Sequence, residues 1–357
     1  MANNDASFLT LFLQPVAAYL ADDSVSEILI NGPSQIYVER KGHLELTPAK
    51  FVNEASLKAA AVNIARSVER LLDDANPDLD ARLPDGSRVH ATIPPVSRSG
   101  TVVSIRKFKK DVLSMASLRA FGSFDEAGER ILTALVRLRK NILVSGGTGS
   151  GKTTVLNCLS SLIPEGERIL VLEDSSELQL KQPHSVYFET RKPDKNGKGE
   201  FSIRDLVRAS LRLRPDRIVV GEIRGAEALD LLQAMNTGHD GSMSTIHANT
   251  PLDTLHRLET CAIMTGLDLP LSAIRVQVAS AVNAVVQTAR LSDGSRKIIG
   301  ISEVLPLVSG EYRVRDVYGW KTESVAPDGG LVGRHEVREA PAFLADAQVM
   351  GFELPWK

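Results

Sequence analysis

Residues 146–154 read Gly-Gly-Thr-Gly-Ser-Gly-Lys-Thr-Thr, a set of residue types that can bind a chain of phosphates. The stretch satisfies G-x-x-x-x-G-K-[ST], in which glycines allow several backbone N–H groups to point at one phosphate. Lys152 can reach the outer phosphates of a nucleotide and act in catalysis, and the Thr153 hydroxyl can ligate Mg²⁺. The residues predicted to bind the nucleotide are Gly146, Gly147, Thr148, Gly149, Ser150, Gly151, Lys152, Thr153 and Thr154.

The sequence on both sides of this loop supports the interpretation. Residues 141–144 are a short apolar run, which predicts a buried strand. After the loop, Val155, Leu156, Leu159 and Leu162 share one face of a predicted helix. A glycine-rich turn that matched the pattern by chance would not need this context. The helix start also adds the positive end of its dipole to the phosphate site.

Two acidic residues follow predicted strands at the positions where a nucleotide site needs carboxylates. Glu222 comes after the apolar residues 218–220, as in a Walker B motif with Glu at the acid position, and can hold Mg²⁺. Glu173 ends the predicted strand at 169–172 and is our candidate general base, while Asp174 can share the metal shell. The base assignment stays open because three neighbouring acids compete for it: Glu173, Asp174 and Glu177.

A polar segment at residues 238–249 carries two histidines. His247 ends a predicted strand at 244–246, a position that suits a sensor of the γ-phosphate. His239 is a second candidate for a functional role. A lone histidine is usually structural, so both assignments depend on the neighbouring phosphate-binding and acidic motifs.

The composition limits the classes of function. The chain has 357 residues, which predicts two domains, and its net charge of −2 provides no basic field for nucleic acid. Aromatic residues make up 5% of the chain, too few for the stacking surface of a nucleic-acid motor. Two cysteines suggest neither a zinc site nor a disulfide framework and fit a cytoplasmic protein. No predicted segment is long and apolar enough to cross a membrane, so we expect membrane contact only through partners.

Element patterns predict an α/β protein with a P-loop nucleotide-binding domain and a smaller N-terminal α+β domain. The predicted N-terminal domain covers residues 1–110, a linker covers 111–122, and the ATPase domain covers 123–357. Alternating strands and helices in the larger domain indicate a mainly parallel sheet, with ligands at the carboxyl ends of the strands. We expect short strands and turns over roughly the last 50 residues.

These segments together resemble the secretion ATPase superfamily, whose members power type II secretion, type IV pili, archaeal flagella and type IV secretion. Its Walker A loop, Asp box, Walker B motif and His box match, in order, residues 146–154, 172–177, 218–225 and 238–247. Residues 212–249, with Arg-Pro-Asp-Arg-Ile-Val-Val-Gly-Glu-Ile-Arg-Gly and Ser-Thr-Ile-His-Ala-Asn, are most similar to the Tad-pilus assembly ATPases. The conjugation and type IV secretion ATPases are the nearest neighbours in this stretch.

The resemblance implies an α/β fold in which a RecA-like P-loop NTPase domain follows a smaller N-terminal α+β, PAS-like domain. The same resemblance implies a homo-hexameric ring of such two-domain subunits that docks on an inner-membrane platform protein from the cytoplasm. It also implies that nucleotide lies between the two domains and that arginines of the N-terminal domain reach the phosphates. The arginines in the matching region are Arg88, Arg98 and Arg106. Secondary candidates within the larger domain are Arg208, Arg214, Arg224 and Arg257. The tetracysteine module of many type II secretion and pilus-extension ATPases is absent, and we expect the long N-terminal extension of many Tad ATPases to be missing or reduced.

The function that we predict is hydrolysis of ATP with Mg²⁺ to drive assembly or retraction of a Tad or type IV pilus, or secretion. The first alternative is a type IV secretion or conjugation ATPase. The second is a nucleotide-gated scaffold that binds ATP without useful turnover, which an intact Lys152, Thr153, Glu173 and Glu222 argue against. A RecA-like nucleic-acid motor is the third, and we expect no direct nucleic-acid binding.

Overall fold

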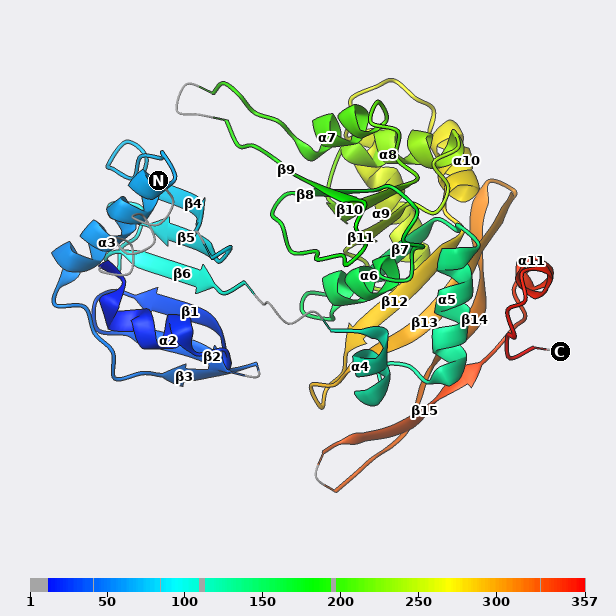
Figure 1. The fold of residues 1–357 in the computed structure, drawn as a ribbon, viewed down its shortest axis with the longest axis horizontal. Coiled ribbons are helices and arrows are strands. Elements are labelled where there is room, and N and C mark those ends of the chain that lie inside the picture. Colours follow the sequence, from blue (N-terminus) through cyan, green and yellow to red (C-terminus); the bar gives the residue numbers. More distant parts are fainter. Residues whose placement is uncertain are drawn as a thin grey trace. The chain divides into compact units, whose positions relative to one another are not determined.

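A computed structural model of the chain describes residues 12–40, 42–83, 85–108, 113–193, 197–327 and 329–356. The chain divides into two compact units, Met1–Asp111 and Val112–Lys357, each of which is considered by itself (Figure 1). Residues 1–11, where the predicted first domain begins, and 109–112, where the predicted linker begins, lie outside the described residues. No helix in the described part of the chain has the length and apolar character needed to span a bilayer.

The first unit is an antiparallel sheet with helices packed on it. The sheet order is β3-β2-β1-β6-β5-β4. Leu57, Ala61 and Ile64 of α3 are fully buried and join the sheet residues Ile28 and Ile105 in one core. The elements are η1 Gln14–Val16, α2 Ala17–Ala21, β1 Val25–Asn31, β2 Ile36–Arg40, β3 His43–Leu46, α3 Glu54–Ser67, β4 Asp78–Arg82, β5 Arg88–Thr92 and β6 Val102–Arg106.

The second unit is built on a nine-stranded sheet in the order β15-β14-β13-β12-β7-β11-β10-β8-β9. The strands from β12 to β9 in this order pair in parallel, and the pairs β12–β13, β13–β14 and β14–β15 are antiparallel. The strands are β7 Ile142–Gly146, β8 Ile169–Glu173, β9 Ser185–Glu189, β10 Arg217–Ile223, β11 Met243–Ile246, β12 Ala284–Arg290, β13 Arg296–Val308, β14 Glu311–Val325 and β15 Leu331–Val337.

Helices cover both faces of this sheet, because its central strands are apolar on both sides. One core contains Val144 and Val171 from the sheet together with buried residues of α5, α6 and α11. The other contains Leu143 and Leu170 with residues of α7, α8, α9 and α10. The helices are α4 Met115–Ala120, α5 Glu126–Arg137, α6 Lys152–Ser160, α7 Ile203–Ser210, α8 Glu227–Asn236, α9 Pro251–Ile263, α10 Leu271–Ala281 and α11 Leu344–Val349. Helix α4 lies within the predicted linker, and its Met115 and Leu118 belong to the first of these cores.

This arrangement agrees with the predicted α/β class, but the prediction for the C-terminal region was wrong. Instead of short strands alone, this region contains β14 with 15 residues, which forms a long antiparallel pair with the 13-residue β13 before it. Figure 1 shows the far ends of β14 and β15 reaching beyond the helices of this unit. Many residues along these strands are only partly buried, so the apolar pattern that reveals a buried strand is weak there.

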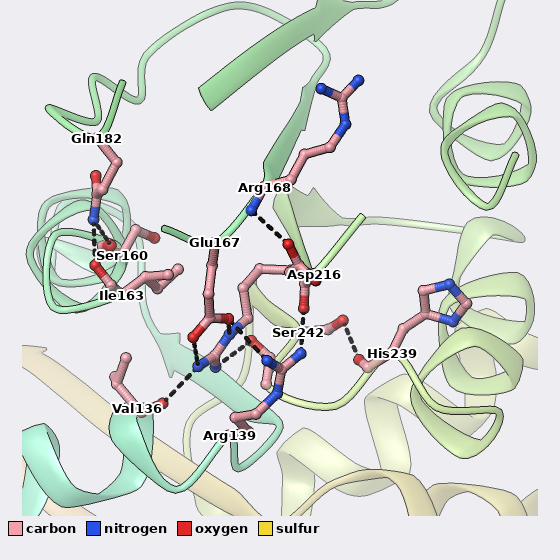
Figure 2. A network of polar contacts seen from close by, with 12 residues as sticks. Val136, Arg139, Ser160, Ile163, Glu167, Arg168, Gln182, Asp216, His239 and Ser242 are labelled. Atoms are coloured by element: carbon pink, nitrogen blue, oxygen red, sulfur yellow. Dashed lines mark hydrogen bonds and ion pairs between the residues drawn. The ribbon is translucent and has the colours of Figure 1, made fainter. Parts of the chain in front are cut away.

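A buried ion pair holds the amino ends of the parallel strands. Arg217, at the start of β10, is fully buried, and its Nε lies 2.6 Å from Glu167 Oε2. Its Nη2 donates to the Val136 carbonyl at 3.1 Å, and Arg139 Nη1 lies 3.0 Å from the same Glu167 oxygen (Figure 2). A buried guanidinium needs such partners, because an unpaired charge away from water is strongly destabilising.

We therefore predict that Glu167→Ala lowers the free energy of unfolding of the second unit by about 3–5 kcal/mol, because it leaves Arg217 buried without its carboxylate. Trp320 and Trp356 are the two tryptophans of the chain, and both lie in this unit, so tryptophan fluorescence during urea unfolding measures it. The control is Glu165→Ala, which removes an exposed carboxylate two residues away. Equal midpoints for the two variants would contradict the assigned role of Glu167.

Candidate active site

The predicted phosphate loop joins β7 to α6, and three of its four glycines have positive φ. Gly151 caps the first turn of α6 with φ of 96°, and Lys152 is the first residue of the helix. Gly146 has φ of 155°, and a Cβ atom there would collide with the backbone and side-chain oxygens of Thr288. In contrast, a Cβ at Gly147 would meet nothing within 4 Å. The loop is therefore supported on one side and open on the other.

Strand β12 supplies that support, and sequence analysis missed it. Thr288 Oγ1 lies 2.8 Å from Ser150 Oγ and donates to the Ser145 carbonyl at 3.0 Å. The neighbouring Gln287 accepts a hydrogen bond from Ser145 Oγ and donates to the Ala248 carbonyl at 3.1 Å. The pattern of the sequence contains no signal for these contacts, because they join segments far apart in the chain through the pairing of β12 with β7.

A continuous line of polar contacts crosses the carboxyl ends of β7, β11 and β10 and joins Lys152, His247 and Glu222. Lys152 Nζ donates to the carbonyls of Gly146 and Gly147 at 3.1 and 2.9 Å, and it lies 3.4 Å from His247 Nδ1. On the other side of the imidazole, His247 Nε2 lies 2.9 Å from Glu222 Oε1. The imidazole therefore connects the phosphate loop to the acid that follows the core of β10.

The charges in this line perturb one another. Burial lowers the pKa of Lys152, and the nearby Glu222 carboxylate opposes that shift. Burial and the Lys152 ammonium lower the pKa of His247, which favours its neutral form. A neutral imidazole can accept from Lys152 at Nδ1 while its Nε2–H faces Glu222.

Glu222 and Asp174 are joined by Arg224, one of the secondary candidates. Arg224 Nε donates to Glu222 Oε2 at 2.7 Å, and its Nη1 lies 3.4 Å from Asp174 Oδ2. The second oxygen of Glu222, Oε1, is buried and makes no hydrogen bond of good geometry despite the nearby His247. Thr153, at the start of α6, makes no hydrogen bond through its hydroxyl to any described residue. Free carboxylate and hydroxyl oxygens are the ligands that Mg²⁺ prefers, so the donor set fits this ion.

Glu173 occupies a different environment from Glu222. Its side chain is 3% exposed, and its Oε1 accepts hydrogen bonds from the backbone of Glu177 and Leu178 at 2.9 and 3.0 Å. Burial raises its pKa to about 7, although the two backbone donors oppose the shift. Its Cγ packs against Gly221, the residue before Glu222, where a Cβ would lie 3.1 Å away. Of the three acids that competed for the role of base, Glu173 is the buried one.

The structure does not bring His239 to this cluster. The histidine precedes β11, whereas His247 follows it, so the two lie at opposite ends of the strand. His239 Nδ1 contacts the Ala234 carbonyl at 3.3 Å. Its own carbonyl accepts from Ser242 Oγ at 2.8 Å (Figure 2). These contacts fix the end of α8, and none of them involves a residue of the phosphate loop.

The three predicted arginines of the first unit separate into two places. Arg88 of β5 and Arg106 of β6 are directly opposite each other in the antiparallel ladder, and Arg82 of β4 is opposite Arg88. Arg98 lies in the connection between β5 and β6, at the other end of this hairpin. Arg82, Arg88 and Arg106 therefore form a row across three neighbouring strands. Sequence analysis did not single out Arg82, and Arg98 lies outside this row.

The remaining secondary arginines have other surroundings. Arg208 Nε is bound to Asp230 at 2.8 Å, which places its guanidinium on the surface of α7 and α8. Arg214 has a left-handed backbone, with φ of 51°, in the turn before β10. Arg257 lies close enough to His247 to lower its pKa electrostatically, although burial is the main cause of that shift.

Comparison with known proteins agrees with this geometry. The family of type II/IV secretion system proteins matches residues 12–330. The chain belongs to this family. It is 37% identical over 310 residues to a Mycobacterium tuberculosis protein that is provisionally named a conjugal transfer protein. This alignment covers 85% of this chain and 87% of the relative. It is 32% identical over 281 residues to the conjugal transfer protein TrbB of Rhizobium radiobacter, with 78% of this chain and 83% of TrbB covered.

Solved structures share the fold and confirm the expected combination of an N-terminal domain with a RecA-like domain. The ATPase DotB of Legionella pneumophila aligns with a TM-score of 0.57 and 19% identity over 86% of this chain and 79% of DotB. The pilus retraction motor PilT, solved with bound ADP, aligns with a TM-score of 0.56 and 19% identity over 96% of this chain and 86% of PilT. The predicted resemblance to secretion ATPases is therefore confirmed at the level of the family.

The raised pKa of Glu173 predicts a pH-dependent stability. Between its ordinary pKa and about 7, the folded state holds a proton that the unfolded state has lost, so stability falls as pH rises through this window. Between about pH 5 and about pH 8, the wild type should lose roughly 3 kcal/mol of unfolding free energy relative to Glu173→Gln. Tryptophan fluorescence during urea unfolding measures this difference, with Glu165→Gln as the exposed control. Parallel pH profiles for wild type and Glu173→Gln would contradict it.

Proposed function

We propose that this protein is an ATPase that hydrolyses ATP with Mg²⁺ to drive a type IV pilus or secretion machine. The observation that carries the proposal is the line of contacts from Lys152 through His247 to Glu222. It connects a phosphate-binding loop to a carboxylate at the end of a neighbouring strand, which is the combination that phosphoryl transfer needs. The hydrolytic activity is inferred for this chain, since the relatives support it at the level of the family.

Each residue has a distinct proposed role. The backbone N–H groups of residues 146–154 hold the phosphates, and Lys152 turns from the loop carbonyls to the outer phosphates when nucleotide binds. Thr153, Glu222 and Asp174 are the proposed ligands of Mg²⁺, which neutralises charge on the β- and γ-phosphates when bound. His247 detects the γ-phosphate, because its imidazole lies between the lysine and the acid.

Glu173 is the proposed general base, which orients water or removes its proton. Its pKa of about 7 suits this role, because a base is most effective when its pKa is close to the working pH. Glu222 is less suited to it, since its carboxylate already accepts from Arg224 Nε at 2.7 Å and lies 2.9 Å from His247 Nε2. Among the described residues, the contacts of His239 are to the end of α8 and to Ser242, and none of them supports a direct catalytic role.

For the assembly, we propose a homo-hexamer in which residues 1–110 and 123–357 act as two domains that change their angle during the cycle. In this arrangement Arg88 and Arg106 of the N-terminal domain supply guanidinium groups to the transferring phosphate. Arg98 is the weaker candidate because it lies at the other end of the hairpin. The proposed location is the cytoplasmic side of the inner membrane, on a platform protein of the machine.

Two systems compete for this motor. Residues 212–249 favour Tad-pilus assembly, whereas the names of the conjugal transfer relatives favour conjugation or type IV secretion. Neighbouring genes separate the two, because pilin and prepilin-peptidase genes belong to a pilus and relaxase genes belong to conjugation. Finding relaxase genes and no pilin genes would replace the pilus assignment with the conjugation assignment.

We predict that Lys152→Ala reduces release of phosphate from ATP by at least about 100-fold, because it removes a cation that faces charge developing in the transition state. Glu222→Gln should lose turnover to a similar extent while it still binds nucleotide. A coupled phosphate-release assay measures turnover, and fluorescence of a labelled nucleotide measures binding.

The matched controls are Lys181→Ala and Glu165→Gln, which remove exposed charges outside the site. Wild-type turnover in Lys152→Ala would exclude the proposed mechanism. A wild-type protein that binds ATP with Mg²⁺ but releases no phosphate would instead support the scaffold alternative.

A further inference from the structure

The hairpin of β12 and β13 presents two arginines on the same side as the phosphate loop. Arg296, the first residue of β13, donates from Nε to the Gly149 carbonyl at 2.9 Å. Its Cδ would lie 3.5 Å from a Cβ on Gly151, so its stem covers the outside of the loop. Arg290 is directly opposite Arg296 in the ladder. Residues opposite each other in an antiparallel pair place their side chains on the same face.

The face shared by the two arginines is the one that supports the loop. Thr288 lies two residues before Arg290 on β12, so both side chains leave the strand on the same face. Thr288 contacts Ser150 Oγ at 2.8 Å, which identifies this face as the side of the phosphate loop. Arg290 therefore extends beyond the loop's first glycine, which is paired with Thr288 in the sheet.

No carboxylate among the described residues lies within ion-pair distance of Arg290 or Arg296. The acid in the turn between them, Asp293, is bound instead to Ser295 and to the backbone of Leu331. Like charges directly opposite each other in a sheet are destabilising. A pair of exposed guanidinium groups without an acid, beside a phosphate-binding loop, is the arrangement expected of an anion-binding surface.

The sheet order shows which end of the phosphate chain these arginines face. Glu173, Glu222 and His247 all come from strands on the β11 side of β7, in the order β7-β11-β10-β8. Arg290 and Arg296 come from β12 and β13, on the opposite side of β7. If the γ-phosphate lies toward the acids and Mg²⁺, the inner phosphate and the nucleoside lie toward the arginines.

We propose that Arg296 and Arg290 bind the α-phosphate end of the nucleotide and so contribute to affinity rather than to catalysis. Arg296 is also a positioning residue, because its Nε holds the Gly149 carbonyl away from the phosphates while both Nη groups remain for the ligand. This inference rests on the proposed function, since it assumes that the loop holds a nucleotide. It assigns a role to β12 and β13 that is separate from the acidic and histidine motifs.

The test compares Arg296→Gln, Arg290→Gln and Arg296→Lys with wild type. Because ADP and ATP share the inner phosphates, each Gln variant should weaken binding of both by the same factor, roughly tenfold for one charge-assisted hydrogen bond. The KM for ATP should rise to a similar extent with kcat within about twofold of wild type, the signature of uniform binding. Arg296→Lys should recover part of the affinity, and the salt dependence of ADP binding should be weaker in both Gln variants.

The control is Arg313→Gln, which removes an exposed arginine on β14. Arg290→Gln tests the charge without removing the Gly149 hydrogen bond, so the inference remains testable if Arg296→Gln misfolds. Affinities equal to those of Arg313→Gln, or a fall in kcat at constant KM, would overturn it. Failure of the wild type itself to bind ADP or ATP would refute the proposed function, whereas normal wild-type binding with unaffected Gln variants would refute this inference alone.

Discussion

The parallel register of β7, β11, β10 and β8 is the constraint on which the site depends. In this ladder Ser145 is paired with Ile246, and Val220 of β10 is paired with Leu172 of β8. These pairs are followed by the phosphate loop, His247, Glu222 and Glu173. All four therefore lie at the same edge of the sheet, where the parallel strands have their carboxyl ends. A shift of one strand by one residue would turn its side chains to the opposite face and separate these groups.

The opposite edge of the sheet carries charge for a different purpose. There Arg217 is fully enclosed and bound to Glu167 and to two backbone carbonyls, so each nitrogen of its guanidinium has a partner. At the proposed active edge, by contrast, Glu222 Oε1 is buried without a well-formed hydrogen bond. The same sheet thus has one edge whose charges are satisfied internally and one edge whose polar atoms remain available for a ligand.

Sequence analysis predicted the parts of the site that depend on local chemistry. The loop at residues 146–154 needs glycines and a lysine at fixed spacing, and His247, Glu173 and Glu222 each follow an apolar strand, so short patterns identified them. Thr288, Gln287 and Arg296 could not be identified in this way, because their contacts depend on the pairing of β12 with β7 and β13. His239 shared a polar segment with His247, but a four-residue strand, β11, separates them in space. The long β13–β14 pair was missed because its residues are too exposed to alternate clearly.

The two glutamates illustrate how one site obtains different chemistry from the same side chain. Glu222 contacts Arg224 and His247, at the end of the line of polar contacts that leads from the phosphate loop, which suits a ligand of the metal ion. Glu173 is buried at the end of the neighbouring strand β8, and burial raises its pKa to about 7, which suits a base. The proposed division between metal ligand and base therefore follows from contacts and burial, which the amino-acid type alone does not determine.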